Sequence, residues 1–319
     1  MTMKKLFLIL ATAVALPVCA QEWPTRAVRI IVPFPPGGSA DLMPRAVGEK
    51  LAEKWGHPVV VENRPGAAGN IGADAVFRAE PDGYTLLSGP PPPLVINRLL
   101  YQKLSYDSSQ FVPITVIGAI PNVLLVHPKT NVTTVKELIA LAKANPGKLN
   151  YASQGSGSTS HLTAELFKSM AGGLQITHVP YKGTAPALTD LLGGQVDIMC
   201  DNLGVSLPHV KSGKLRALAV ASSKRVKSLP GVPTLAETLP GFEAVAWFGI
   251  VAPPKTPQAI ADKINADVNE ALHQGEIRDR LAQLSAEPIG GTPQATAAYM
   301  REEIERWRNV IKAANVKLE

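Results

Sequence analysis

The sequence predicts an α/β protein with two lobes, each built around a mostly parallel sheet. Two observations predict this class. Short β-rich runs alternate with helical patterns, and a loop rich in Gly, Pro or Ser separates each run from the helix after it; this alternation is typical of α/β sheets. Once a leader of 20 residues is set aside, about 300 residues remain, close to the length at which one hydrophobic core divides into two.

The first 20 residues have the features of a secretory signal peptide. Lys4 and Lys5 precede an apolar stretch, residues 6–16, and the segment ends in Val-Cys-Ala, so we expect cleavage after Ala20. A membrane anchor needs roughly 20 apolar residues, more than this stretch has. Lipid attachment at Cys19 is disfavoured because the preceding Pro-Val lacks small residues. The mature chain is therefore expected to be exported.

Composition excludes some functions. Removing the two leader lysines lowers the formal charge from +6 to +4; the remaining basic residues are scattered and aromatic residues make up 5% of the chain. A nucleic-acid groove needs a basic stripe with stacking rings, so we expect no nucleic-acid partner. Cys200 is the one cysteine left after cleavage, and no intramolecular disulfide is expected.

The elements follow from local patterns. Apolar spacing and turn residues place the strands, and capping residues place the helices. Strands are expected at residues 29–32, 59–61, 84–88, 123–126, 150–153, 176–179, 196–199, 215–221 and 243–251. Helices are expected at residues 42–55, 73–79, 134–144, 162–170 and up to 192, with two more that begin at Thr256-Pro257 and Thr292-Pro293.

The loop VPFPPGGSAD, residues 32–41, predicts an anion site. Its prolines hold the chain stiff and lack N–H groups, whereas Gly37 and Gly38 restore donors and allow a ligand close to the backbone. Ser39 is a candidate N-cap for the next helix, whose first N–H groups have no internal partner. A positive helix end with free donors suits a carboxylate. The alternative is a helix start whose cap satisfies itself.

Three further loops have the same position after a strand. QGSGSTSH, residues 154–161, crowds four hydroxyls and two glycines at a helix start, with His161 either a ligand contact or a packed side chain. PYKGTAPA offers Tyr181 and Lys182 before the N-cap candidate Thr184, and CDNLG offers Asp201 and Asn202. Caps, braces and solvated charges are the alternatives for these residues.

Enzyme motifs are incomplete. GGSAD departs from the G-x-S-x-G nucleophile elbow, and GAAGNIG departs from the G-x-G-x-x-G dinucleotide fingerprint. The six histidines show no spacing suited to zinc. We therefore expect no catalytic residue, no metal and no cofactor, and the loops indicate binding without chemistry.

Eight segments, in order, resemble signatures of the tripartite tricarboxylate transporter substrate-binding proteins, also called Bug-type receptors or the TctC family. They are VPFPPGGSAD, VVVENRPGAAGNIGA, PDGYTL, YASQGSGSTSHL, HVPYKGTAPALTDLLGGQVDIMCDN, GKLRALAVAS, LPGVPTLAE and WFGIVAPPKTP, so the resemblance covers essentially the whole mature chain from Trp23.

The resemblance implies a periplasmic binding protein-like fold in which crossing strands join two α/β lobes around a ligand cleft. It implies a periplasmic receptor that captures a small carboxylate and delivers it to a membrane permease with a large and a small subunit. We expect a monomer. Lobe 1 would comprise residues 21–122 and 248–319, and lobe 2 residues 123–247, with crossing strands near 123–126 and 246–251.

The resemblance also implies the site. The loop at residues 34–41 and the loop at residues 156–161 of the facing lobe would hold one carboxylate, partly through ordered water. The Tyr181 loop and the Asp201 strand end would complete the cleft. The expected ligand-binding residues are Phe34, Pro36, Gly37, Gly38, Ser39, Asp41, Pro90, Ser156, Gly157, Ser158, Thr159, His161, Tyr181, Lys182, Asp201 and Asn202.

One segment departs from the family pattern. Many relatives have small polar residues with a histidine where this chain has GPPPPLVIN, residues 89–97. Because proline removes donors from that wall, we expect an aromatic or aliphatic mono- or dicarboxylate in preference to citrate. Two other functions stay open: a secreted hydrolase that uses Ser39 or Ser156 with His161, and a sensor subunit that signals to a membrane partner.

Overall fold

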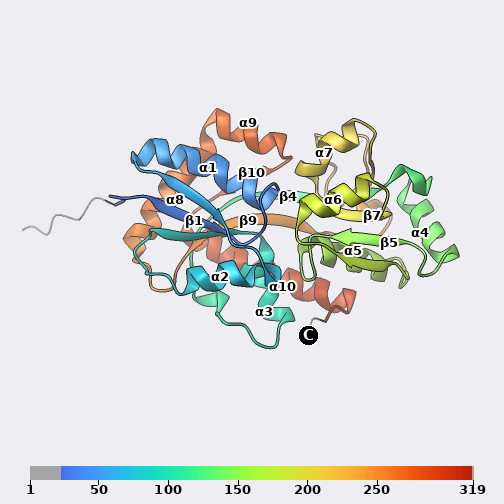
Figure 1. Cartoon of the computed structure of the whole chain (residues 1–319), viewed down its shortest axis with the longest axis horizontal. Helices are drawn as coiled ribbons and strands as arrows, with labels where there is room; N and C mark the ends of the chain where they lie inside the picture. The colour runs from blue at the N-terminus through green and yellow to red at the C-terminus, as the bar shows by residue number, and fades with distance from the viewer. Residues whose placement is uncertain (1–22, 318–319) are drawn as a thin grey trace, which may run out of the picture.

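The computed structural model describes residues 23–317, so the predicted signal peptide lies outside the described residues. Figure 1 shows two lobes side by side, one carrying α1, α2, α8 and α9, the other α4 to α7. The expected two-lobed α/β fold is confirmed. Among the described helices, none is long and apolar enough to cross a membrane.

The first lobe is built on strands that pair in the order β2-β1-β3-β9-β4, with β10 also paired to β4. Its strands are β1 (Val28–Val32), β2 (Val59–Asn63), β3 (Thr85–Gly89), β9 (Val245–Ala252), β10 (Glu287–Gly290) and the first part of β4 (Val112–Val126).

The second lobe continues from the end of β4, in the order β4-β7-β5-β6, with β8 paired to β4 as well. Its strands are β5 (Asn150–Ser153), β6 (Thr177–Pro180), β7 (Ile198–Asn202) and β8 (Arg216–Val220).

Strand β4 passes from one lobe into the other. Residues 112–121 pair with β9, whereas residues 122–126 pair with β7 and 123–126 with β8. The sequence predicted only residues 123–126 of this strand. The part that was not predicted contains Pro113 and Pro121, and its register with β9 shifts twice. Prolines and bulges both interrupt the hydrogen bonds between strands, so they make a strand harder to recognise in a sequence.

The expected parallel pairing holds for the outer strands. β1 is parallel to β2 and β3, and β5 is parallel to β6 and β7. Every pairing made by β4 or β9 is antiparallel. The parallel strands direct their carboxyl ends, and the loops that follow, toward the junction of the lobes.

Helices cover both faces of the continuous sheet. Val28, Ile30 and Val32 of β1 pack with α1 and α8, whereas Ile31 packs with α2, as the alternation of a strand requires. The helices are α1 (Ser39–Trp55), α2 (Asn70–Phe77), α3 (Asn97–Leu100), α4 (Val135–Ala144), α5 (Thr159–Met170), α6 (Thr184–Leu192), α7 (Leu203–Lys211), α8 (Gln258–His273), α9 (Gly275–Gln283) and α10 (Pro293–Ala314).

Three helix starts differ from prediction by one residue. Gly38, Gly183 and Pro257 occupy the N-cap positions, so Ser39 and Thr184 are the first helical residues and the predicted caps at Ser39, Thr184 and Thr256 are wrong. Gly38 takes the extended cap conformation at α1, whereas Gly183 caps α6 with a φ of +108°, a value that favours glycine. Caps at Thr134 and Thr292 are confirmed, since their hydroxyls accept from Glu137 N at 3.1 Å and Ala295 N at 3.1 Å.

The proline-rich segment after β3 is helical, not an irregular loop. Pro92–Ile96 forms a π-helical turn that runs into α3. The buried Asn97 anchors it by donating from Nδ2 to Ala68 O at 3.0 Å and to Asn70 Oδ1 at 2.6 Å. Prolines suit the first turn of a helix because the N–H groups there lack internal partners.

Helix α10 lies along both lobes. Trp247 of β9 and Trp307 of α10 donate their indole N–H groups to Oε2 of the buried Glu303, at 2.8 and 3.1 Å. Near its end, α10 accepts a hydrogen bond at Ala313 O from Ser169 of α5. The C-terminal helix therefore ties the crossing strand to the second lobe.

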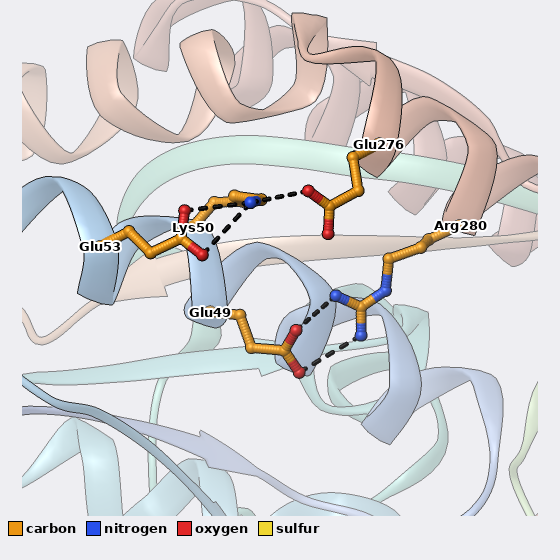
Figure 2. Close-up of polar contacts among 5 residues, drawn as sticks. All are labelled: Glu49, Lys50, Glu53, Glu276 and Arg280. Carbon is orange, nitrogen blue, oxygen red and sulfur yellow. Dashed lines mark hydrogen bonds and ion pairs between the residues drawn. The ribbon is translucent and has the colours of Figure 1, made fainter.

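Ion pairs fix α9 on α1 at the outer surface of the first lobe (Figure 2). Arg280 of α9 binds both carboxylate oxygens of Glu49, and Lys50 bridges Glu53 at 3.0 Å and Glu276 at 2.7 Å. Each helix therefore contributes one cation and one carboxylate to the ion pairs between them.

Candidate functional site

A small cavity lies where the lobes meet, at the carboxyl ends of the strands. Four helix starts, those of α1, α5, α6 and α7, contribute to its walls. The lining residues are Phe34, Pro35, Gly38, Ser39, Ala40, Pro90, Pro92, Gln154, Ser158, Thr159, Gly183, Thr184, Asn202 and Phe248. The space open to the centres of water-sized atoms is about 20 Å³, room for about one water, so the lobes are closed around it.

The start of α1 supplies donors. The N–H groups of Ser39 and Ala40 precede the first intrahelical bonds, which run from Asp41 N and Leu42 N to Gly38 O at 2.9 and 3.0 Å. Ser39 is 1% exposed and its Oγ has no hydrogen-bond partner in the described residues. A buried hydroxyl without a partner is costly, so this atom is available to a ligand.

Asp41 braces the loop from behind. Its carboxylate accepts from Gly37 N at 3.1 Å, Arg45 Nε at 2.9 Å and Asn63 Nδ2 at 2.8 Å. Burial acts to raise the pKa of Asp41, but these hydrogen bonds outweigh it and lower that pKa below its usual range. Gly37 has a φ of +88°, which favours glycine. The brace fixes the direction in which the α1 donors point.

The start of α5 faces α1. Ser158 caps α5 by accepting from His161 N at 3.2 Å, and Ser158 and Thr159 both line the cavity. The His161 ring turns back, accepting from Gly157 N at Nδ1 (3.2 Å) and stacking on His178 with ring centres 4.3 Å apart. Burial lowers the pKa of His161 to about 4, so the ring is neutral at physiological pH.

The α1 and α6 loops touch across the cleft. A Cβ atom placed on Gly38 would lie 3.2 Å from Thr184 Oγ1, and one placed on Gly183 would lie 3.0 Å from Pro35 Cγ. Both separations are shorter than ordinary contacts to a Cβ atom. Glycine at both positions therefore lets the lobes close this far.

A polar network backs the cavity at the end of β7. Gln154 Nε2 donates to Asp201 Oδ1 at 2.9 Å and to Asn202 Oδ1 at 3.3 Å. Asn202 Nδ2 donates to Oδ1 of Asn122, on the crossing part of β4, at 2.8 Å. Asp201 is fully buried, its Oδ2 has no partner in the described residues, and burial raises its pKa to about 6.

A larger pocket of about 660 Å³ adjoins the cavity and shares Phe34, Pro35, Gln154, Ser158 and Gly183 with it. The wall from the first lobe is apolar or backbone, whereas the second lobe contributes polar side chains. The further lining residues are Pro33, Pro65, Gly66, Ala67, Ala68, Gly69, Gly155, Ser156, Pro180, Tyr181 and Lys182.

The predicted site residues fall into two groups. Those that line the cavity or the adjoining pocket are Phe34, Gly38, Ser39, Pro90, Ser156, Ser158, Thr159, Tyr181, Lys182 and Asn202. Those that line neither are Pro36, Gly37, Asp41, Gly157, His161 and Asp201. The second group shapes or backs the loops.

The prediction omitted seven residues that line the cavity: Pro35, Ala40, Pro92, Gln154, Gly183, Thr184 and Phe248. Most belong to loops that the sequence analysis had identified, and Thr184 had been predicted as an N-cap but not as a ligand-binding residue. Phe248 lies within β9, and no local sequence pattern indicates that its side chain faces the cavity.

The described residues offer no arrangement suited to catalysis by His161. No serine hydroxyl among residues 23–317 hydrogen-bonds to its ring. Ser153 Oγ does lie 2.6 Å from His178 Nε2, but Ser153 is fully buried, so a substrate could not reach it. Within the same residues, no cluster of three or more His, Cys, Asp or Glu side chains could hold a metal ion.

The fold and the cavity are those of a class of protein: two-lobed binding proteins that hold a small solute between their lobes. The chain belongs to the tripartite tricarboxylate transporter family of receptors (TctC), whose model matches residues 43–316.

Relatives agree with this assignment. The chain is 41% identical over 315 residues to the protein BugT of Bordetella pertussis, covering 98% of this chain and 96% of BugT. An R. palustris protein solved with adipate is 41% identical with a TM-score of 0.90, covering 93% of this chain and 99% of that one. MatC from Rhodopseudomonas palustris with bound malate is 36% identical with a TM-score of 0.86, covering 91% and 100%.

Proposed function

We propose that this receptor captures a small organic acid in the periplasm by closing its lobes and delivers it to a membrane permease made of a large and a small subunit. In this proposal the leader is cleaved after Ala20 and the receptor acts as a monomer. Residues 21–122 and 248–319 form lobe 1 and residues 123–247 form lobe 2, so that β4 and β9 serve as the hinge.

One observation carries the proposal: free helix N-termini from both lobes converge on a cavity that also contains the buried, unpartnered Ser39 Oγ. Each helix end is worth roughly 0.3–1 kcal/mol to an anion when exposed and up to about 2 kcal/mol when partly buried. Several such contacts with apolar burial reach about 8 kcal/mol, the free energy of micromolar binding.

The walls favour a ligand with few polar groups beyond its carboxylates. Pro90, Pro92 and Phe248 line the inner cavity, and Phe34 and Pro35 lead from it into the adjoining pocket. These side chains donate no hydrogen bonds. The ligand class is therefore an aliphatic or aromatic mono- or dicarboxylate, in keeping with the adipate and malate complexes of the relatives.

Native mass spectrometry of the protein as purified, followed by a thermal-shift panel, tests the proposal. The panel contains adipate, malate, benzoate and citrate. A ligand at 100 times its Kd stabilises the folded protein by about 2.7 kcal/mol. We expect stabilisation by at least one of the first three acids. Stabilisation by citrate alone would contradict the ligand class, and the absence of binding by every acid would contradict the function.

A further inference from the structure

Asp201 is a carboxyl group without a counter-ion behind an anion site. It is fully buried, and no lysine, arginine or histidine lies within ion-pair distance of it in the described part of the chain. Its Oδ1 accepts one hydrogen bond from Gln154, and its Oδ2 accepts none. Burying an unpaired charge is strongly unfavourable, and such a group commonly takes up a proton instead.

The elements packed on β7 place no charge against Asp201. Val123 of β4 is its partner in the ladder, and Ser206 of α7 bonds backbone oxygens at Asn202 and Leu203. Strand β4 has no titratable residue. Those on β5, α5, α6, α7 and the strand of Asp201 itself are Tyr151, Cys200, His161, Glu165, Lys168, Asp190, His209 and Lys211.

Those residues do not neutralise it. Burial keeps the Cys200 thiol protonated by raising its pKa, Glu165 pairs with Lys168 at 2.7 Å, and Asp190 accepts from Tyr181 OH at 2.6 Å. No charged group perturbs the pKa of Asp201, which burial raises to about 6. The ionisation of Asp201 is therefore governed by burial, by the neutral hydrogen-bond donors around it, which act to lower its pKa, and by whatever enters the cavity.

Gln154 connects Asp201 to the cavity. Both hydrogens of its side-chain amide are used, toward Asp201 Oδ1 at 2.9 Å and Asn202 Oδ1 at 3.3 Å. This leaves Oε1, an acceptor, as the free group of a side chain that lines both the cavity and the adjoining pocket. A carboxylate ligand also only accepts, so the amide in this orientation cannot bind it.

We propose that Asp201 takes up one proton from solvent when the cleft binds its carboxylate, and that the neutral acid then donates to Gln154 Oε1. The Gln154 amide turns over, and its NH₂ group faces the ligand. The receptor therefore binds the anion together with a proton. This inference rests on the proposed function, because it requires that a carboxylate occupy the cleft.

Repulsion between like charges determines whether ligand binding takes up or releases a proton. A bound anion near Asp201 disfavours its ionised form and raises its pKa above the value of the free protein. Between the two pKa values, binding takes up protons and the affinity falls as pH rises, by up to about tenfold per pH unit. At pH 5 the free protein already holds the proton, so little uptake remains.

Isothermal titration calorimetry in two buffers of different ionisation enthalpy counts the protons directly. The probe is the acid that binds most tightly among adipate, malate, benzoate and citrate. At pH 7.5 we expect wild type to take up close to one proton per ligand. Asp201→Asn cannot ionise, and its amide can donate to Gln154 Oε1 at every pH, so its proton uptake at pH 7.5 is expected to be zero.

Asp197→Asn is the matched control. Asp197 is a buried carboxylate of the same lobe, but it is paired with Lys129 at 3.1 Å and accepts from Asn150 N at 2.9 Å. We expect this variant to keep the wild-type proton count. His161 and His178 do not confuse the count, because burial lowers the pKa of each to about 4.

Three results are decisive. Binding by wild type without proton uptake at pH 7.5 overturns the inference and leaves the proposed function standing, and this measurement suffices even if Asp201→Asn does not fold. Uptake that persists in folded Asp201→Asn also overturns it. If no acid of the panel binds at any pH, the proposed function fails and the inference fails with it.

Discussion

Gly38 sets how far the lobes can close. Its φ of −89° and ψ of 169° are extended values open to any residue, so a side chain there does not strain the backbone. A Cβ would, however, lie 3.2 Å from Thr184 Oγ1 and 3.7 Å from Thr184 Cβ, across the cleft. Substitution at Gly38 should therefore act on closure and not on the folding of either lobe.

The size of the effect follows from this contact. Alanine needs the facing loop to give by a few tenths of an ångström, and we expect a cost near the lower end of the 1–3 kcal/mol typical of overpacking, about 1 kcal/mol. Valine extends the side chain by a further bond of about 1.5 Å, which points to about 3 kcal/mol. In affinity these costs correspond to roughly fivefold for Gly38→Ala and more than about 100-fold for Gly38→Val.

Calorimetric titration with the best-bound acid of the panel measures both variants, and thermal unfolding without ligand checks that they fold. Gly231→Val is the control, because a Cβ at Gly231 meets nothing within 4 Å. Thr184→Ala removes Oγ1 and should rescue Gly38→Ala, since the next contact, at 3.7 Å, is an ordinary one. Unchanged affinity in Gly38→Val would refute the reasoning.

Three further predictions concern stability. Because burial raises the pKa of Asp201 from 3.8 to about 6, the free energy of unfolding of wild type should fall by about 2 kcal/mol relative to that of Asp201→Asn as pH rises from 4 to 6. Urea unfolding at both pH values measures this, and a pH-independent difference contradicts it. Glu303→Ala leaves two buried tryptophan N–H groups without an acceptor and should cost about 3–5 kcal/mol, against less than about 0.5 kcal/mol for the exposed Glu305→Ala. Arg280→Ala removes the exposed pair with Glu49 and should cost no more than about 1 kcal/mol at low salt and less at 1 M salt; an equal cost at both salt concentrations would mean that the ion pair is not its source.

Local chemistry explains what could be predicted from the sequence. The alternation of strands and helices and the loops at strand ends depend on residues close together in the chain, so the fold class and four cleft loops were predictable. A shift of one residue was enough to mislead at Ser39. As an N-cap its hydroxyl would serve the helix, whereas as the first helical residue it is left without a partner.

Long-range contacts explain what was missed. Gln154 and Phe248 line the cavity because the two lobes close on each other. The residues next to them in the sequence carry no pattern that predicts this contact between lobes. The first part of β4 was missed because Pro113 and Pro121 obscure a strand that its partner β9 completes. The role of Asp41 as a brace likewise depends on Asn63, which arrives from the adjacent strand.

The pairing of β3 with β9 has a consequence for synthesis and export. Leu87 of β3 lies opposite Val251 of β9, so the partner of an entirely buried strand emerges only after the whole second lobe has been made. Until then β3 presents an open edge, to which another chain could add a strand. Truncated or stalled chains that end before residue 245 should therefore aggregate, because the sheet of the first lobe can be completed only after the second lobe has been made.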